Sequence, residues 1–95
     1  MTTKILIVDD EARMRDLIKM YLLKEGYQVI EASNGKEALD KMANNNFDLV
    51  ILDIMMPEID GLTLCKEIRK KSDIPIVMVT AKGEEFDKVL GFELG

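Results

Sequence analysis

The chain has 95 residues, of which 47% are hydrophobic and 33% are charged. These proportions are those of globular proteins, so neither a disordered chain nor a fibrous repeat is expected. The 13 Lys and Arg residues against 18 Asp and Glu residues give a formal net charge of −5. This charge argues against nucleic-acid binding, because contacts to phosphates need a surplus of basic residues.

The numbers of cysteine and histidine residues exclude further kinds of chemistry. Cys65 is the single cysteine, so the chain cannot form an internal disulfide, which suits a reducing compartment. The chain has no histidine, so it lacks the commonest general base and cannot itself carry a phosphohistidine. Apolar runs such as residues 49–52 are too short to span a bilayer, and the N-terminus does not resemble a signal peptide. We expect one small acidic domain over residues 1–95, located in the cytoplasm.

The first half of the chain predicts two strand–helix pairs. Residues 4–9 form a β-branched run without polar alternation, which is typical of a parallel strand covered on both faces. Residues 11–25 carry apolar side chains at helical spacing, and Gly26 is a natural stop for this helix. The apolar stripe of this helix is Met14, Leu17, Ile18, Tyr21 and Leu22. Residues 27–32 predict a second strand, and a turn at residues 33–35 leads into a shorter helix. The apolar positions of this shorter helix are Ala38, Leu39 and Met42.

The second half repeats the pattern. Residues 48–53 predict a third strand, and a loop over residues 54–60 connects it to a helix over residues 61–71. Residues 74–80 predict a fourth strand, and residues 83–94 predict a fourth helix. The apolar positions of that last helix are Phe86, Val89, Leu90 and Leu94. Four such units predict an α/β fold in which a parallel sheet, joined by right-handed crossovers, has helices on both faces.

Polar residues with useful chemistry gather where the predicted strands end. Asp9 and Asp10 follow the first strand, while Asp53 and Thr80 close the third and the fourth. The carboxyl ends of parallel strands share one edge of the sheet, and ligands bind in a crevice outside that edge. Three carboxylates brought together repel one another unless a cation or protons neutralise them. We therefore predict a site for a hard divalent cation such as Mg²⁺, at which a carboxylate could also accept a phosphoryl group.

Three separated motifs resemble those of one known family. They are residues 5–11 (Ile-Leu-Ile-Val-Asp-Asp-Glu), residues 48–61, which run from Asp48 through Asp53 to Gly61, and residues 75–82 (Pro-Ile-Val-Met-Val-Thr-Ala-Lys). In this order and at this spacing they resemble the receiver domain of bacterial two-component response regulators, over the whole chain. The C-terminal part is most similar to receivers that precede a winged-helix DNA-binding domain. The resemblance implies a flavodoxin-like three-layer sandwich with strand order 2-1-3-4-5.

The resemblance also implies a role for each matching residue. Asp53 would accept the phosphoryl group from the phosphohistidine of a sensor histidine kinase. Asp10 and Asp53 would hold Mg²⁺ through their carboxylates, Asp9 would do so directly or through water, and Met55 would add its backbone carbonyl. Thr80 would turn its hydroxyl toward the new phosphoryl group and so couple phosphorylation to a conformational switch.

The remaining implications concern the loop over the site and the output. Pro57 and Gly61 would shape that loop. The chain would assist its own phosphorylation without being a classical enzyme, and its output would be control of transcription. DNA would be contacted only by an effector domain that this sequence does not include, and no membrane contact is implied.

The sequence departs from the family pattern at its C-terminal end. The family continues with a fifth strand, which ends in a phosphate-contacting lysine and a proline, and with a fifth helix. Neither is present, and Lys82 does not match that lysine, so the fold is expected to be an incomplete, four-unit version. We expect impaired switching, an unpaired edge on the fourth strand that favours self-association or domain swapping, and a partly uncovered sheet face beside the first helix. The end at Gly95 falls inside a family motif, which favours an engineered boundary.

Alternative interpretations remain for the same residues. Asp10 could be only the N-cap of the first helix, Thr80 only a strand residue, and Cys65 is expected in the core. A flavin-binding module shares the topology, but Asp9 and Asp10 would repel its phosphate. An aspartate-nucleophile phosphatase usually has a second acid two residues after the nucleophile, where this chain has Met55. The strongest rival is a truncated or engineered structural fragment that self-associates and does not signal.

Overall fold

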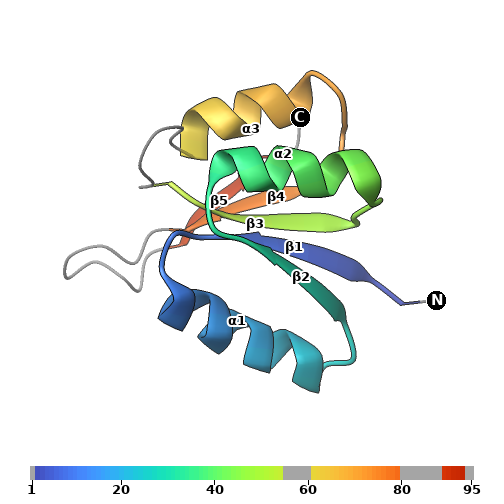
Figure 1. Ribbon diagram of the computed structural model, residues 1–95, viewed down its shortest axis with the longest axis vertical. Coiled ribbons are helices and arrows are strands. Elements are labelled where there is room, and N and C mark those ends of the chain that lie inside the picture. Colours follow the sequence, from blue (N-terminus) through green and yellow to red (C-terminus); the bar gives the residue numbers. More distant parts are fainter. Residues whose placement is uncertain (1, 55–60, 80–88, 94–95) are drawn as a thin grey trace.

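The computed structural model describes residues 2–54, 61–79 and 89–93. Within them, a central sheet lies between α1 on one face and α2 with α3 on the other, which gives the expected three layers (Figure 1). The strands are β1 (Lys4–Val8), β2 (Gln28–Ala32), β3 (Leu49–Asp53), β4 (Ile76–Val79) and β5 (Val89–Glu93), and the helices are α1 (Ala12–Lys24), α2 (Gly35–Asn44) and α3 (Gly61–Arg69).

The strand order in the described part of the chain is β2-β1-β3-β4-β5. The first four strands pair in parallel, so their carboxyl ends lie along one edge of the sheet. This confirms the flavodoxin-like α/β fold and the place of each of the four predicted strands. The third strand is central, because β3 pairs with both β1 and β4.

The last described segment differs from the prediction. A helix over residues 83–94 is wrong for residues 89–93, which form β5 and pair antiparallel with β4, while residues 83–88 and 94 lie outside the described residues. The apolar spacing fits a helix, but Gly91 in its interior disfavours one, and the ladder to β4 satisfies the backbone groups instead. The predicted unpaired edge on β4 is therefore also wrong, because β5 occupies it.

Helix α1 ends as the sequence predicts. Gly26 has a φ of 90°, in the left-handed region that glycine adopts without strain. Its N–H donates to the carbonyl of Leu23, and the N–H of Tyr27 donates to that of Leu22, at 3.0 and 3.1 Å. These bonds satisfy carbonyl groups that the helix end would leave open. The chain then turns directly into β2.

The face of the sheet beneath α2 and α3 carries the main hydrophobic core. Every second residue of β1, β3 and β4 points to this face, as strand geometry requires. Cys65 of α3 is 5% exposed and belongs to the cluster, as predicted. The buried members are Leu6, Val8, Ala32, Ala38, Phe47, Val50, Leu52, Leu64, Cys65, Ile68, Ile76 and Met78.

The opposite face is covered less completely. Among the described helices only α1 lies over it (Figure 1), and no residue of α1 is buried. Leu17 and Tyr21, which belong to the predicted apolar stripe, are 45% and 62% exposed. Ile7 is fully buried beneath α1, whereas Ile51 and Val77 on the neighbouring strands are only half-buried. The partly uncovered face expected from the sequence is therefore present among the described residues.

Candidate metal centre

Three carboxylates meet at the carboxyl edge of the sheet. Asp9 directly follows β1, Asp10 is next, and Asp53 is the last residue of β3, the parallel neighbour of β1. One carboxylate oxygen from each of the three lies within 4.8 Å of the others. Asp9 and Asp53 are 2% and 1% exposed, whereas Asp10 is the most exposed of the three. The structure thus brings together the acids that the sequence places at one edge.

The donor set fits a small hard cation. All three groups offer carboxylate oxygens, and Mg²⁺ takes oxygen ligands, usually one or two carboxylates together with water and phosphate. With bonds of about 2.1 Å, ligands on opposite sides of an octahedral ion lie about 4.2 Å apart, so the observed cluster needs little adjustment. Burial of two of the acids strengthens their mutual repulsion, which a bound cation relieves.

The backbone and side chain of Asp9 are held from several sides. Its N–H donates to the carbonyl of Ala32 at the end of β2, at 3.1 Å. Its Oδ1 accepts from the N–H of Glu11 at 2.9 Å, and its carbonyl accepts from Nη1 of Arg15 at 2.6 Å. The N-cap of α1 is Glu11 and makes no side-chain capping bond, so the interpretation of Asp10 as a simple N-cap is wrong.

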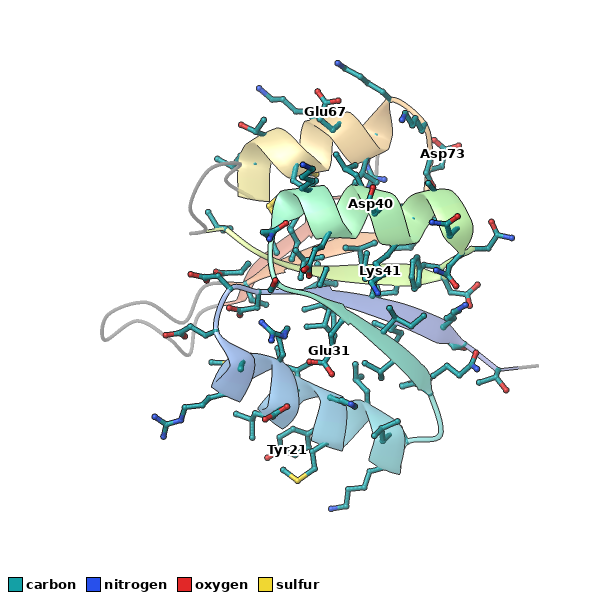
Figure 2. All side chains as sticks on the ribbon, in the orientation of Figure 1. Tyr21, Glu31, Asp40, Lys41, Glu67 and Asp73 are labelled. Carbon is teal, nitrogen blue, oxygen red and sulfur yellow. The ribbon has the colours of Figure 1, made fainter. Side chains whose placement is uncertain are left out.

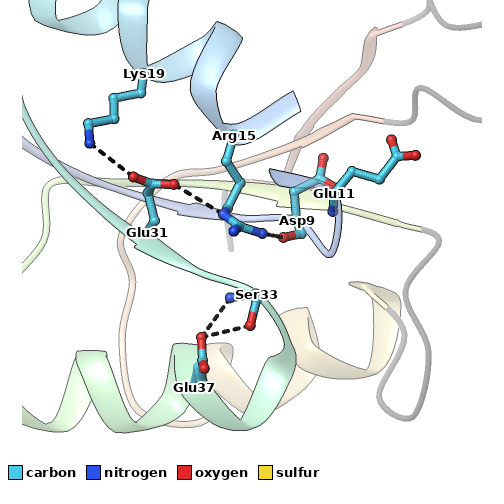
Figure 3. Close-up of polar contacts among 7 residues, drawn as sticks. All are labelled: Asp9, Glu11, Arg15, Lys19, Glu31, Ser33 and Glu37. Atoms are coloured by element: carbon cyan, nitrogen blue, oxygen red, sulfur yellow. Dashed lines mark hydrogen bonds and ion pairs between the residues drawn. The ribbon is translucent and has the colours of Figure 1, made fainter. Parts of the chain in front are cut away.

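Arg15 belongs to a charged group on the α1 face of the sheet. Its Nε donates to Oε1 of Glu31 on β2 at 3.1 Å, and Nζ of Lys19 donates to Oε2 of the same residue at 3.0 Å (Figure 3). The hydrogen bond from Lys19, assisted by the one from Arg15, holds the pKa of Glu31 below its usual value of 4.5 against the opposing effect of burial. The carboxyl group of Glu31 is therefore ionised at neutral pH.

Helix α3 begins against the backbone that carries Asp53. The N–H of Gly61 donates to the carbonyl of Ile54 at 2.9 Å. A Cβ at position 61 would lie 2.6 Å from the Cα of Ile54 and would clash with the carbonyl oxygen of Asp53. These are backbone atoms that cannot swing aside, so the close approach of α3 to the acidic edge requires glycine here.

Four residues discussed for the site lie outside the described residues. They are Met55, Pro57, Thr80 and Lys82. Their roles stay predictions, and so does the role of Gly61 in shaping the loop over the site.

The sequence reasoning missed Arg15 and Glu31. A signal was available, because Glu31 is the one acid inside the predicted strand of residues 27–32, on the strand that pairs with β1. Arg15 and Lys19 are four residues apart and so lie on one face of α1. An acid within a strand next to a helix with two such cations indicates a paired network.

A separate hollow lies at the opposite edge of the sheet. It has a volume of about 250 Å³ and lies between the C-terminal ends of α2 and α3, where Met42, Phe47 and Ile68 contribute to its walls. The acidic cluster is not among its lining residues. The two ends of the strands therefore carry different features, and the candidate chemistry found among the described residues lies at the carboxyl end. None of the described helices has the length and apolar character needed to cross a membrane.

The sequence is similar to those of known transcriptional regulators. It is 56% identical over 93 residues to the transcriptional regulatory protein ResD of Bacillus subtilis, and this match covers 98% of the chain and 39% of ResD. It is 50% identical over 95 residues to the transcriptional regulatory protein SrrA of Staphylococcus aureus, covering 100% of the chain and 39% of SrrA. The chain thus spans about two fifths of the length of these relatives.

The fold is similar to those of solved receiver proteins. The response regulator TrrA of Thermotoga maritima, solved in complex with Mg²⁺-BeF, superposes with a TM-score of 0.81 at 48% identity, over 92% of this chain and 76% of that one. TrrA in complex with the histidine kinase ThkA gives a TM-score of 0.80 at 50% identity, over 87% and 72%. The family model of the response regulator receiver domain matches residues 5–95, and the chain therefore belongs to the response regulator receiver domain family.

Proposed function

We propose that the chain is a phosphoacceptor in two-component signalling, in which Asp53 receives a phosphoryl group at a Mg²⁺ site. The observation that carries the proposal is the convergence of the Asp9, Asp10 and Asp53 carboxylates at the carboxyl edge of the sheet. The solved complex of the related TrrA with Mg²⁺-BeF supports the choice of metal. The complex of TrrA with the histidine kinase ThkA supports a sensor histidine kinase as the donor.

The three acids would bind the cation, and Asp53 would also be the nucleophile. The backbone carbonyl of Met55 would be a further ligand of the cation. When bound, Mg²⁺ supplies positive charge that offsets the negative charge of the transferring group. An oxygen of Asp53 forms a bond to phosphorus while the bond from phosphorus to the donor's imidazole nitrogen breaks, and that nitrogen then takes a proton from solvent. The chain thereby assists its own phosphorylation without turning over as a classical enzyme.

The arrangement of Asp53 suits a nucleophile. It is buried at 1% exposure, on the central strand β3, and its backbone is packed against the start of α3. A carboxylate on such a fixed backbone needs little reorganisation, and fixed positioning is the main protein contribution to phosphoryl transfer.

The output of the proposed reaction is a switch that controls transcription. The hydroxyl of Thr80 would bind the phosphoryl group, and the segment that follows it in the sequence would respond. The names of ResD and SrrA, both transcriptional regulatory proteins, support this output, which would be delivered by an effector domain that contacts DNA. The structural-fragment alternative loses the particular edge through which self-association was expected, because β5 pairs with β4.

A small phosphodonor tests the proposal without a kinase. Incubation of the 95-residue chain with acetyl phosphate and Mg²⁺, followed by intact-mass measurement, should add one phosphoryl group. Omission of Mg²⁺ or the substitution Asp53→Asn should abolish the gain, because each removes a group that the transfer needs. Asp40→Asn is the matched control, since Asp40 is an exposed acid on α2 (Figure 2) and should leave the gain unchanged. No gain in the wild-type chain, or an equal gain in Asp53→Asn, would contradict the proposal.

A further inference from the structure

Arg15 connects the acidic edge to the neighbouring strand. Its guanidinium group donates from Nη1 to the carbonyl oxygen of Asp9 at 2.6 Å and from Nε to Oε1 of Glu31 at 3.1 Å (Figure 3). The Arg15 side chain is only 17% exposed, so these bonds are partly shielded from water. A planar guanidinium with donors in fixed directions holds two acceptors in one geometry, which a lysine ammonium does not do.

The carbonyl that Arg15 binds belongs to the peptide that joins Asp9 and Asp10. The Cα atoms of Asp9 and Asp10 therefore lie in the plane of one peptide group. The orientation of that plane limits the directions in which both carboxylates can point. The other side of Asp9 is tied to β2, because its N–H donates to the carbonyl of Ala32. With Arg15 in place, both backbone polar groups of residue 9 are fixed relative to β2.

Glu31 fixes Arg15 in turn. It lies directly opposite Ile7 in the β1–β2 ladder, on the sheet face covered by α1. Lys19 binds its second oxygen at 3.0 Å, so both carboxylate oxygens of Glu31 are engaged by cations of α1. The chain of contacts runs from Lys19 through Glu31 and Arg15 to the Asp9–Asp10 peptide.

We propose that Arg15 is a positioning residue for the metal centre: it orients the Asp9–Asp10 peptide so that both carboxylates face Asp53. The inference rests on the proposed function, because it assumes that these acids bind a divalent cation. Arg15 touches neither the cation nor the transferring group and acts only through the backbone of Asp9.

The direction in which Mg²⁺ affinity changes when Arg15 is substituted distinguishes a positioning role from a purely electrostatic one. A cation beside a Mg²⁺ site repels the metal, so loss of the Arg15 charge alone should strengthen Mg²⁺ binding or leave it unchanged. Loss of positioning should weaken it, because residues that orient metal ligands change affinity by about 10- to 100-fold. Lys19 offers the matched control, since it carries the same charge and contacts the same Glu31 but does not contact Asp9.

The test is calorimetric titration of MgCl₂ into the wild-type chain and into Arg15→Gln and Lys19→Gln, with circular dichroism to check folding. We expect Arg15→Gln to weaken Mg²⁺ binding by about tenfold, at the low end of the range for such residues. Lys19→Gln should bind Mg²⁺ as tightly as the wild type or slightly more tightly. Equal or tighter binding in Arg15→Gln would overturn the inference while leaving the proposed function standing. No Mg²⁺ binding in the wild type would overturn both.

A second variant protects the test against misfolding. If Arg15→Gln fails to fold, Arg15→Lys tests the positioning role instead. This variant retains the charge but lacks the guanidinium group that binds both Glu31 and Asp9. We expect its Mg²⁺ affinity to lie below that of the wild type, whereas wild-type affinity would overturn the inference.

Discussion

The two faces of the sheet are built from the same strands but held together differently. In the β2-β1-β3-β4 order, one row of paired residues faces α2 and α3 and is buried throughout. The next row along the strands faces α1, begins with a half-buried carboxylate, and has two half-buried apolar members. The first row is Ala32, Val8, Leu52 and Met78, and the second is Glu31, Ile7, Ile51 and Val77.

The two faces of the sheet therefore make different contributions to stability and to the metal centre. The α2–α3 face buries the apolar cluster and should supply most of the stability. The α1 face adds fewer buried apolar contacts, but its charged residues reach the backbone at the metal centre. Substitutions on the two faces should therefore separate stability from cation binding.

The largest effect on stability is expected in the core beneath α3. Leu64 is fully buried, and Leu64→Ala should lower the free energy of unfolding by about 3 kcal/mol, through lost burial and the cavity left behind. The matched change on the other face, Leu17→Ala, should cost less than about 1 kcal/mol because Leu17 is 45% exposed. Urea unfolding measures both. Equal losses would show that the two faces contribute alike.

The next substitution should lower both the stability of the fold and the affinity of the metal centre. Gly61→Ala places a methyl group against the backbone of Asp53 and Ile54, and should cost about 2 kcal/mol as overpacking does. It should also weaken Mg²⁺ binding, because the end of β3 must shift. Gly26→Ala is the control: its φ of 90° makes it cost about 1–2 kcal/mol, but it lies at the other end of α1. If both variants change Mg²⁺ affinity equally, close packing at Gly61 has no special bearing on the site.

The smallest effect depends on pH. Hydrogen bonds from Lys19 and Arg15 lower the pKa of Glu31 in the folded chain. The stability that this carboxylate contributes is therefore fully present above its unfolded pKa, near 4.5, and is lost as the pH falls through the lower folded value. Glu31→Gln should cost roughly 1 kcal/mol or less at pH 6, and clearly less near pH 3. Urea unfolding at both pH values checks this, and an equal cost at both would contradict it.

Much of the fold and the acidic cluster could be predicted from local patterns. The uninterrupted apolar runs before Asp9 and Asp53 indicate parallel strands, and parallel strands place their carboxyl ends together. Those two facts were enough to bring Asp9, Asp10 and Asp53 to one edge, where the structure has them. The pattern needed no knowledge of distant side chains.

The errors arose where distant contacts decide the outcome. Residues 89–93 carry helix-like spacing, yet they pair with β4 across a separation that local periodicity does not reveal. Leu17 and Tyr21 fit an apolar stripe on α1, yet both stay exposed, because periodicity does not reveal how much of a helix a neighbouring element covers. Arg15 belongs to none of the three motifs, and although its spacing from Lys19 hinted at a partner for Glu31, its bond to the carbonyl of Asp9 is seen only in the structure.

The most direct test of the central claim follows Mg²⁺ through the amide resonances of the wild-type chain. Titration of MgCl₂ should give saturable shifts at Asp9, Asp10 and Asp53, while the amides of Asn45 and Asp48 at the opposite edge stay in place. That result is expected if the three acids form one cation site at the carboxyl edge. Shifts that fail to saturate, or that spread evenly over the acidic surface, would contradict it.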